Sequence, residues 1–173
     1  MKKLTIKKLK KDINRLWSWL FEKRSEIFEM NYKDAFMAQI VVEILQSSKT
    51  NNFNLIPLYN LRPIHPVDNR DNTIQATKKR IEILNIHKNK LLKNKKVTRN
   101  DLAKYLPSAT YIRGVPINDK EFYIFDGNGR IEALKQTFCP SDNMKIEVDV
   151  YHPANLKRTL KNIEKLRKMH EMI

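Results

Sequence analysis

The sequence predicts an α+β fold, and three observations lead to that class. Apolar residues recur at helical spacing in some segments, whereas other segments alternate or form the short apolar runs typical of strands. Turn-forming residues separate the two kinds of segment. With 173 residues and a hydrophobic content of 41%, the chain is long enough for one domain with a sizeable core, extended by helices at both ends.

Two amphipathic segments predict a helical hairpin within residues 1–50. The first apolar stripe lies within residues 8–28, and the second runs from Phe36 to Leu45. The turn-rich segment 47–52 is expected to end the hairpin. Trp17, in the first stripe, is expected to contact the core or a protein partner.

Residues 53–152 predict the main α+β domain, and residues 153–173 predict a C-terminal amphipathic helix. Thr98 is a suitable N-cap for the helix that follows it, and Asp101 stands three residues later, as in a capping box. A loop rich in Pro and Asn is expected over residues 62–72. The domain's strands are expected at 53–61, 109–115, 121–125 and 144–152, and its first two helices at 74–92 and 99–106.

The formal net charge of +15 is concentrated in blocks, one of which is the long helix predicted after residue 74. Clustered cations favour a polyanion, because binding to phosphates releases counterions. The helix has no aromatic residues, so we expect contact with the backbone of DNA or RNA and little sequence specificity. A solvated helix face is the alternative. The expected nucleic-acid contacts are Lys78, Lys79, Arg80, Lys88, Lys90, Lys93, Lys95 and Lys96.

The sequence predicts no metal site, because Cys139 is the only cysteine and the four histidines lack ligand spacing. A lone cysteine suits a reducing compartment, so we expect the cytoplasm or an organellar matrix. No apolar run approaches the roughly 18–20 residues of a membrane span, and none resembles a signal-peptide core. No membrane partner is expected, but the terminal amphipathic helices offer faces for a protein partner.

The segment "FYIFDGNGRIEALK" (122–135) predicts a strand, a glycine turn and a helix. A helix that starts after glycines exposes unpaired backbone N–H groups and the positive end of its dipole, which favour an oxyanion such as phosphate. Arg130 adds a planar guanidinium suited to phosphate oxygens. Asp126 is expected to cap the helix or to assist a metal or hydroxyl group. The expected phosphate ligands are Gly127, Asn128, Gly129 and Arg130; an ordinary strand-to-helix turn is the alternative.

Residues 53–152 resemble the ParB/sulfiredoxin superfamily, a small mixed sheet with packed helices. Gly127 and Arg130 match the glycine and arginine of its G-x-x-R turn, and Ala133 and Leu134 match the helix that follows. The upstream strand, loop and helix resemble its first conserved box, with Arg70 at the end of the loop. The resemblance implies that this loop lies opposite the turn and forms a two-sided pocket. Asp68 and Arg70 therefore join the expected ligand-binding residues.

The resemblance implies a nucleotide ligand, since partition proteins of this superfamily hold CTP at the turn. A nucleoside triphosphate with Mg²⁺ is the implied cofactor, and phosphoryl transfer or nuclease-like chemistry is the implied activity if the protein is an enzyme. Asn128 and Gly129 stand where sulfiredoxins have cysteine and histidine, which excludes their redox chemistry. They also replace the acidic residue and second arginine of partition proteins. Asp126 and Glu132 are the candidate catalytic residues.

Three functional hypotheses follow. The first is a nucleic-acid-associated, ParB-like domain that binds a phosphate or nucleotide at the turn. The second is a non-catalytic basic protein that binds RNA or DNA inside a ribonucleoprotein assembly such as a ribosome. The third is a relative of the Fic nucleotidyl transferases, whose H-P-F-x-(D/E)-G-N-G-R motif shares "DGNGR". Phe122 stands at the position of the Fic catalytic histidine, so that base is missing.

Overall fold

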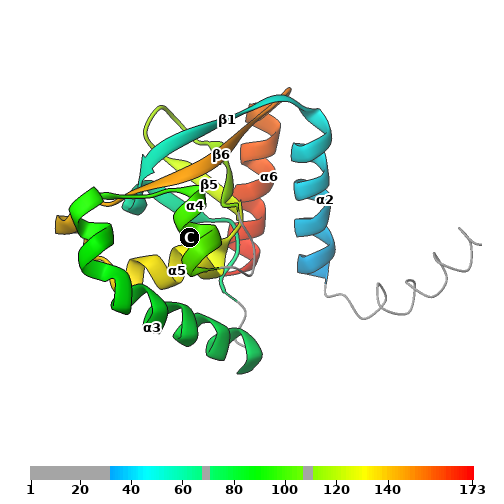
Figure 1. Ribbon diagram of the computed structural model, residues 1–173. Coiled ribbons are helices and arrows are strands. Elements are labelled where there is room, and N and C mark those ends of the chain that lie inside the picture. Colours follow the sequence, from blue (N-terminus) through cyan, green and yellow to red (C-terminus); the bar gives the residue numbers. More distant parts are fainter. Residues whose placement is uncertain (1–31, 68–70, 107–110) are drawn as a thin grey trace, which may run out of the picture. The chain divides into compact units, whose positions relative to one another are not determined.

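The computed structural model describes residues 32–67, 71–106 and 111–173 (Figure 1). The chain divides into two compact units, residues 1–39 and residues 40–173, and only the second is described at length. The predicted first helix of the hairpin, with Trp17, lies outside the described residues.

The second predicted helix of the hairpin is present as α2, Tyr32–Ser47, in which Ile40 and Ile44 are buried. The segment after it does not form the expected turn, because strand β1 begins directly at Ser48. We predicted boundaries near residues 50 and 153, whereas the compact unit begins at Ile40 and includes the C-terminal helix.

A mixed six-stranded sheet forms the centre of the second unit. Its main path runs β1–β6–β4–β5–β2, and β3 pairs with β6 beside that path. The β1–β6 and β4–β5 pairs are antiparallel, whereas β4–β6, β2–β5 and β3–β6 are parallel. The strands are β1 (Ser48–Pro57), β2 (Leu61–Pro63), β3 (Lys96–Val97), β4 (Arg113–Pro116), β5 (Phe122–Asp126) and β6 (Lys145–Pro153).

The strand that the sequence predicts over 53–61 is two strands at opposite edges of the sheet. β1 ends at Pro57, and the short 3-10 helix Leu58–Asn60 turns the chain before β2 begins at Leu61. The backbone N–H of Leu58 donates to the carbonyl of Met144 at 2.9 Å, which holds the turn beside β6. Proline has no N–H for the ladder, so the break at Pro57 follows from its chemistry.

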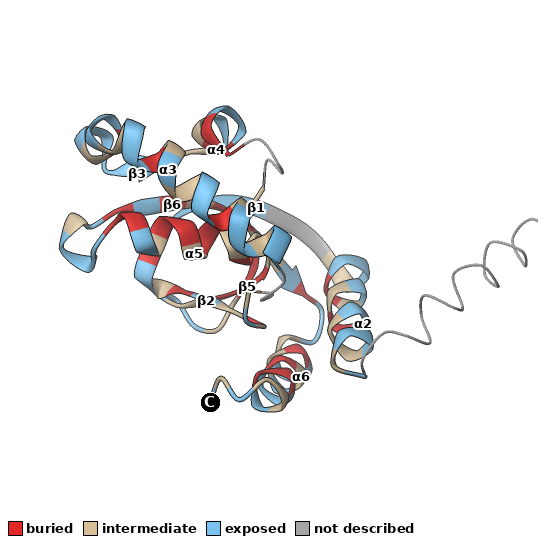
Figure 2. Cartoon of the chain, turned by 90° about the horizontal axis from the view of Figure 1, so that it is seen from below, coloured by how far each residue is buried: buried red, intermediate tan, exposed pale blue. Residues whose placement is uncertain are grey.

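Helices cover both faces of the sheet (Figures 1 and 2). α3 (Asp71–Asn94) packs against α5 (Asn128–Thr137) on one face, with α4 (Arg99–Tyr105) nearby. α6 (Leu156–Met169) lies against the other face, next to β6. A 3-10 turn, Pro140–Asp142, separates α5 from β6.

Alternation along the strands divides the buried residues between the two faces. Ile124 of β5 belongs to the main core with Ile146 and Val148 of β6. Its neighbours Tyr123 and Phe125 point the other way, where Phe125 contacts Tyr151 edge-to-face. Both faces of β5 are therefore buried, so its last residue is fixed in position where the turn begins.

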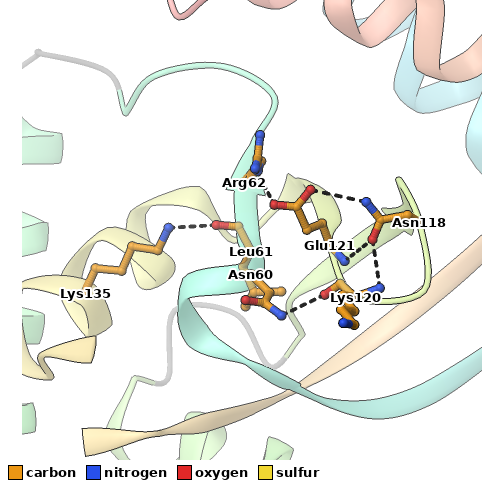
Figure 3. Close-up of polar contacts among 7 residues, drawn as sticks. All are labelled: Asn60, Leu61, Arg62, Asn118, Lys120, Glu121 and Lys135. Carbon is orange, nitrogen blue, oxygen red and sulfur yellow. Dashed lines mark hydrogen bonds and ion pairs between the residues drawn. The ribbon is translucent and has the colours of Figure 1, made fainter. Parts of the chain in front are cut away.

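Polar contacts attach the short edge strand β2 to its surroundings (Figure 3). The Arg62 guanidinium pairs with the Glu121 carboxylate, and the Asn60 side chain donates to the Lys120 carbonyl. From α5, the Lys135 ammonium donates to the Leu61 carbonyl at 2.7 Å. Burial lowers the pKa of Lys135, although Glu132 partly raises it. These contacts fix the start of the loop that leads to α3.

The predicted α+β class is confirmed by this mixture of helices and a mixed sheet. The helix predicted at 74–92 is present and longer, and the predicted capping box at Thr98 is present with both of its hydrogen bonds. In the part of the chain that the structure describes, none of the helices has the length and apolar character needed to cross a bilayer.

Replacement of Thr98 by alanine is expected to destabilise the protein by about 1 kcal/mol. The substitution removes the acceptor for the Asp101 N–H and the hydroxyl that donates to the Asp101 carboxylate. Asn100→Ala is the control, since Asn100 is exposed on the same helix. Urea denaturation measures both, and equal midpoints for the two variants would contradict the cap's role.

Candidate functional site

Gly127 forms the turn between β5 and α5. Its φ of 99° lies in the left-handed region, where a side chain would be strained. A Cβ at this position would also stand 3.0 Å from the Cγ1 atom of Ile112. The predicted strand–turn–helix order is therefore present, with β5 ending at Asp126 and α5 beginning at Asn128.

The first turn of α5 presents two backbone N–H groups. The N–H groups of Arg130 and Ile131 donate to the Gly127 carbonyl at 2.9 and 3.0 Å. Those of Asn128 and Gly129 have no hydrogen-bond acceptor among the described residues. Because they stand at the positive end of the helix dipole, they offer an anion two donors.

Arg130 is buried, contrary to its expected role as an open guanidinium. Its side chain is 5% exposed, and its Nη1 atom donates to the Tyr111 carbonyl. Burial lowers the pKa of Arg130; the Asp126 carboxylate raises it, and the cations Arg80 and Arg113 lower it further. Arg130 thus holds the segment before β4 while it contributes positive charge to the turn.

The Arg80 guanidinium of α3 lies beside Gly129. A Cβ on Gly129 would stand 3.2 Å from its Nη1 atom and 3.9 Å from the Thr77 hydroxyl. Glycine at 129 therefore allows the side chain of α3 to reach the start of α5. The sequence placed Arg80 among the nucleic-acid contacts of the long helix, and only the packing of α3 on α5 brings it to the turn.

Arg113 of β4 lies beside the turn between β5 and α5 through its contact with Asp126, and no sequence motif marks it. Its Nη1 atom lies 3.4 Å from Oδ2 of Asp126, and its Nε is buried without a hydrogen-bond partner. The charges of Arg80, Arg113 and Asp126 all act on the Arg130 guanidinium, so these four side chains lie near one another at the end of β5 and the start of α5. Cationic side chains gathered beside a helix start favour an anion.

A hollow of about 310 Å³, here called the turn hollow, opens at the start of α5. The loop between β2 and α3 forms its opposite wall with His65 and Val67. The Asn128 side chain donates to the His65 carbonyl at 3.3 Å and joins the two walls. Asp68 and Arg70, which we expected in this wall, lie outside the described residues. The lining residues are His65, Val67, Thr73, Arg80, Phe125, Asp126, Gly127, Asn128, Gly129 and Arg130.

A larger and more apolar hollow of about 490 Å³ adjoins the turn hollow, and Val67 and Asn128 line both. Two polar atoms at its wall, Oγ1 of Thr77 and Oδ1 of Asn128, are buried without a hydrogen-bond partner among the described residues. Both side chains are more than nine-tenths buried. Glu132 lines this second hollow, whereas Asp126 lines the turn hollow, so the two candidate catalytic carboxylates do not share one site.

Of the other basic residues expected to contact nucleic acid, Lys78 lines the second hollow with Asn128, and none of the rest lines the turn hollow. The Lys88 ammonium is half-buried and lies 6.0 Å from the centre of the Phe138 ring. The remaining six are exposed and follow α3 to its end: Lys78, Lys79, Lys90, Lys93, Lys95 and Lys96. Among the described residues, no cluster of His, Cys, Asp and Glu is arranged to hold a metal ion.

Replacement of Arg130 by methionine is expected to destabilise the protein by about 1–3 kcal/mol, because the Tyr111 carbonyl would lose its donor in a buried place. Arg62→Met is the control, since Arg62 also makes an ion pair but is exposed, where such pairs contribute little. Chemical denaturation compares the two variants. If Arg130→Met were as stable as the control, this guanidinium would not stabilise the fold through the Tyr111 carbonyl.

Comparison of the chain with protein-family models, with curated proteins and with solved structures found no match.

Proposed function

We propose that residues 40–173 form a nucleic-acid-associated domain that binds a phosphate-bearing ligand, a phosphate or a nucleotide, in the turn hollow. The observation that carries this proposal is the approach of the Arg80 guanidinium to Gly129 at the start of α5, in a hollow that Arg130 also lines. The backbone N–H groups of Asn128 and Gly129, which have no acceptor among the described residues, lie beside Arg130, whose guanidinium is held by the Tyr111 carbonyl. Guanidiniums and helix-start amides are the groups that proteins use for phosphate oxygens.

We also propose that the domain belongs to the ParB/sulfiredoxin superfamily, on the resemblance of residues 53–152. The order of strand, glycine turn, helix and strand over β5, α5 and β6 supports it. The placement of His65 and Val67 across from the turn agrees with the two-sided pocket that the resemblance implies. A nucleoside triphosphate with Mg²⁺ would then lie with its phosphates toward Arg80, Gly129 and Arg130.

A second candidate function is non-catalytic binding of RNA or DNA inside a larger assembly. The observation that favours it is the separation of Glu132 from the turn hollow, together with the ion pair that engages Asp126. Glu132 then lies outside the turn hollow, and Asp126 is engaged by Arg113 instead of being open to act as a general base. The exposed lysines of α3 would contact the nucleic-acid backbone, and the turn would hold one phosphate of it.

Replacement of Arg80 by glutamine is expected to weaken binding of pyrophosphate or a ribonucleoside triphosphate about 10- to 100-fold, because a charge-assisted hydrogen bond is lost. The matched control is Lys79→Gln, which removes the same charge from an exposed neighbour. Calorimetric titration with and without Mg²⁺ measures both. No binding by the wild-type protein, or equal losses in the two variants, would overturn the proposal.

Gly129→Ala provides a second variant that separates binding from stability. Alanine at a helical position stabilises a helix by up to about 1 kcal/mol relative to glycine, while its Cβ would crowd the Arg80 guanidinium. The expected result is a protein at least as stable as wild type that binds pyrophosphate more weakly. Unchanged affinity would show that the position of Arg80 is irrelevant to the ligand.

A further inference from the structure

Four residues form one row across the sheet, from its edge to the turn hollow. Phe53 of β1 pairs with Asp149 of β6, Asp149 pairs with Arg113 of β4, and Arg113 pairs with Asp126 of β5. Directly paired residues project from the same face of a sheet. The register shift between Arg113 and Gly114 places Asp126 opposite Arg113, so Asp126 shares a face with Arg113 and Asp149 although Ile124 faces the core. At a strand spacing of about 4.8 Å, the row is roughly 14 Å long.

Aromatic rings and guanidiniums alternate above this row. The Arg99 guanidinium lies 4.1 Å from the centre of the Tyr111 ring and 5.9 Å from that of Phe53. Arg113 approaches the same Tyr111 ring, at 5.3 Å. The Phe53 and Tyr111 rings are 6.4 Å apart and inclined by 28°, a stacked arrangement. We call Phe53, Arg99, Tyr111 and Arg113 the aromatic platform.

The platform has unused binding capacity. Phe53 is 48% exposed on the edge strand β1, so part of its ring is open to a partner. The Arg99 guanidinium makes no hydrogen bond and no ion pair in the described part of the chain; only its backbone N–H is engaged, with the Glu147 carboxylate at 2.8 Å. The face of the Arg99 guanidinium lies on the Tyr111 ring, and the N–H groups along its edge remain available to donate hydrogen bonds to a ligand.

The charges around the platform nearly balance. Asp149 is buried beneath it, Asp126 pairs with Arg113, and Glu147 accepts from the backbone of Arg99. A partner attracted by charge alone would gain little here. A partner with flat, polarisable rings would gain from stacking on the exposed Phe53, which Tyr111 supports from behind, and its hydrogen-bond acceptors would meet Arg99.

We propose that the aromatic platform binds unpaired bases of a single-stranded nucleic acid. This inference deepens the nucleic-acid association proposed above, because the platform leads to the turn hollow, where a phosphate of the same strand would lie. Stacking on aromatic side chains and Arg is how proteins hold single strands with little sequence preference. Duplex bases are already stacked on one another, so a duplex would leave the platform without a partner.

The test is fluorescence anisotropy with a labelled single strand of about 12 nucleotides, RNA or DNA, and with the matching duplex. Replacement of Phe53 by alanine is expected to weaken single-strand binding about 5- to 100-fold and to leave duplex binding unchanged. Leu55→Ala is the matched control, since Leu55 is equally exposed at 47% on the same face of β1 but has no ring to stack.

Salt dependence separates the platform from the lysines of α3. Phe53→Ala should lower affinity without changing the slope of log K against log salt, because stacking releases no counterions. The double variant Lys90→Gln, Lys93→Gln should reduce that slope by roughly one to two units, since each lost phosphate contact contributes about 0.7–0.9. Equal affinities for Phe53→Ala and Leu55→Ala would overturn the inference and leave the platform as a protein-docking face or an internal brace.

Ultraviolet cross-linking gives an independent measurement, with the cross-linked peptides identified by mass spectrometry. Cross-links at Phe53 or Tyr111 are expected, and cross-links confined to α3 would contradict the platform. Failure of pyrophosphate to bind while Phe53→Ala still weakens single-strand binding would refute only the turn hollow. The opposite pair of results would refute only the platform.

Discussion

The hydrogen bond from the buried Arg130 guanidinium to the Tyr111 carbonyl is the interaction on which both proposed binding surfaces depend. At one end it fixes the first turn of α5, where Gly129 and Arg80 meet. At the other end it fixes the chain just before β4, and so the ring of Tyr111 between Arg99 and Arg113. The buried charge costs free energy, and its hydrogen bond adds a side-chain connection between two surfaces that the β4–β5 pairing of Arg113 with Asp126 also joins.

Much of the fold could be predicted from local signals. The capping box at Thr98, the strand–turn–helix order at Gly127 and the alternation along β6 each depend on residues close in sequence, so spacing reveals them. The strand predicted over 53–61 was wrong in extent, because its apolar run does not show that Pro57 divides it between opposite edges of the sheet. Pairing partners far apart in sequence leave no such local signal.

The candidate site was predictable only in part, for a related reason. Glycines at 127 and 129 indicate that another group comes close to the backbone, but the sequence does not show which group it is. At Gly129 the group is Arg80, about fifty residues earlier in the chain. Tyr111 and Arg113 belong to no recognisable sequence motif. Their neighbours are determined by the register of β4 against β5 and β6, which the sequence does not show. Conversely, the motif arginine at 130 is engaged inside the protein, which sequence spacing alone does not reveal.

The unpaired oxygens of Thr77 and Asn128 have a consequence for selectivity. An acceptor removed from water and left without a donor costs about 1–3 kcal/mol. A molecule whose N–H or O–H reached these oxygens would recover that free energy on binding. An analogue of equal shape with only carbon at the same positions would leave both oxygens unpaired. The protein would then discriminate between two such compounds through the cost of these unpaired oxygens. It would bind the compound that donates to them more tightly than the compound that leaves them unpaired.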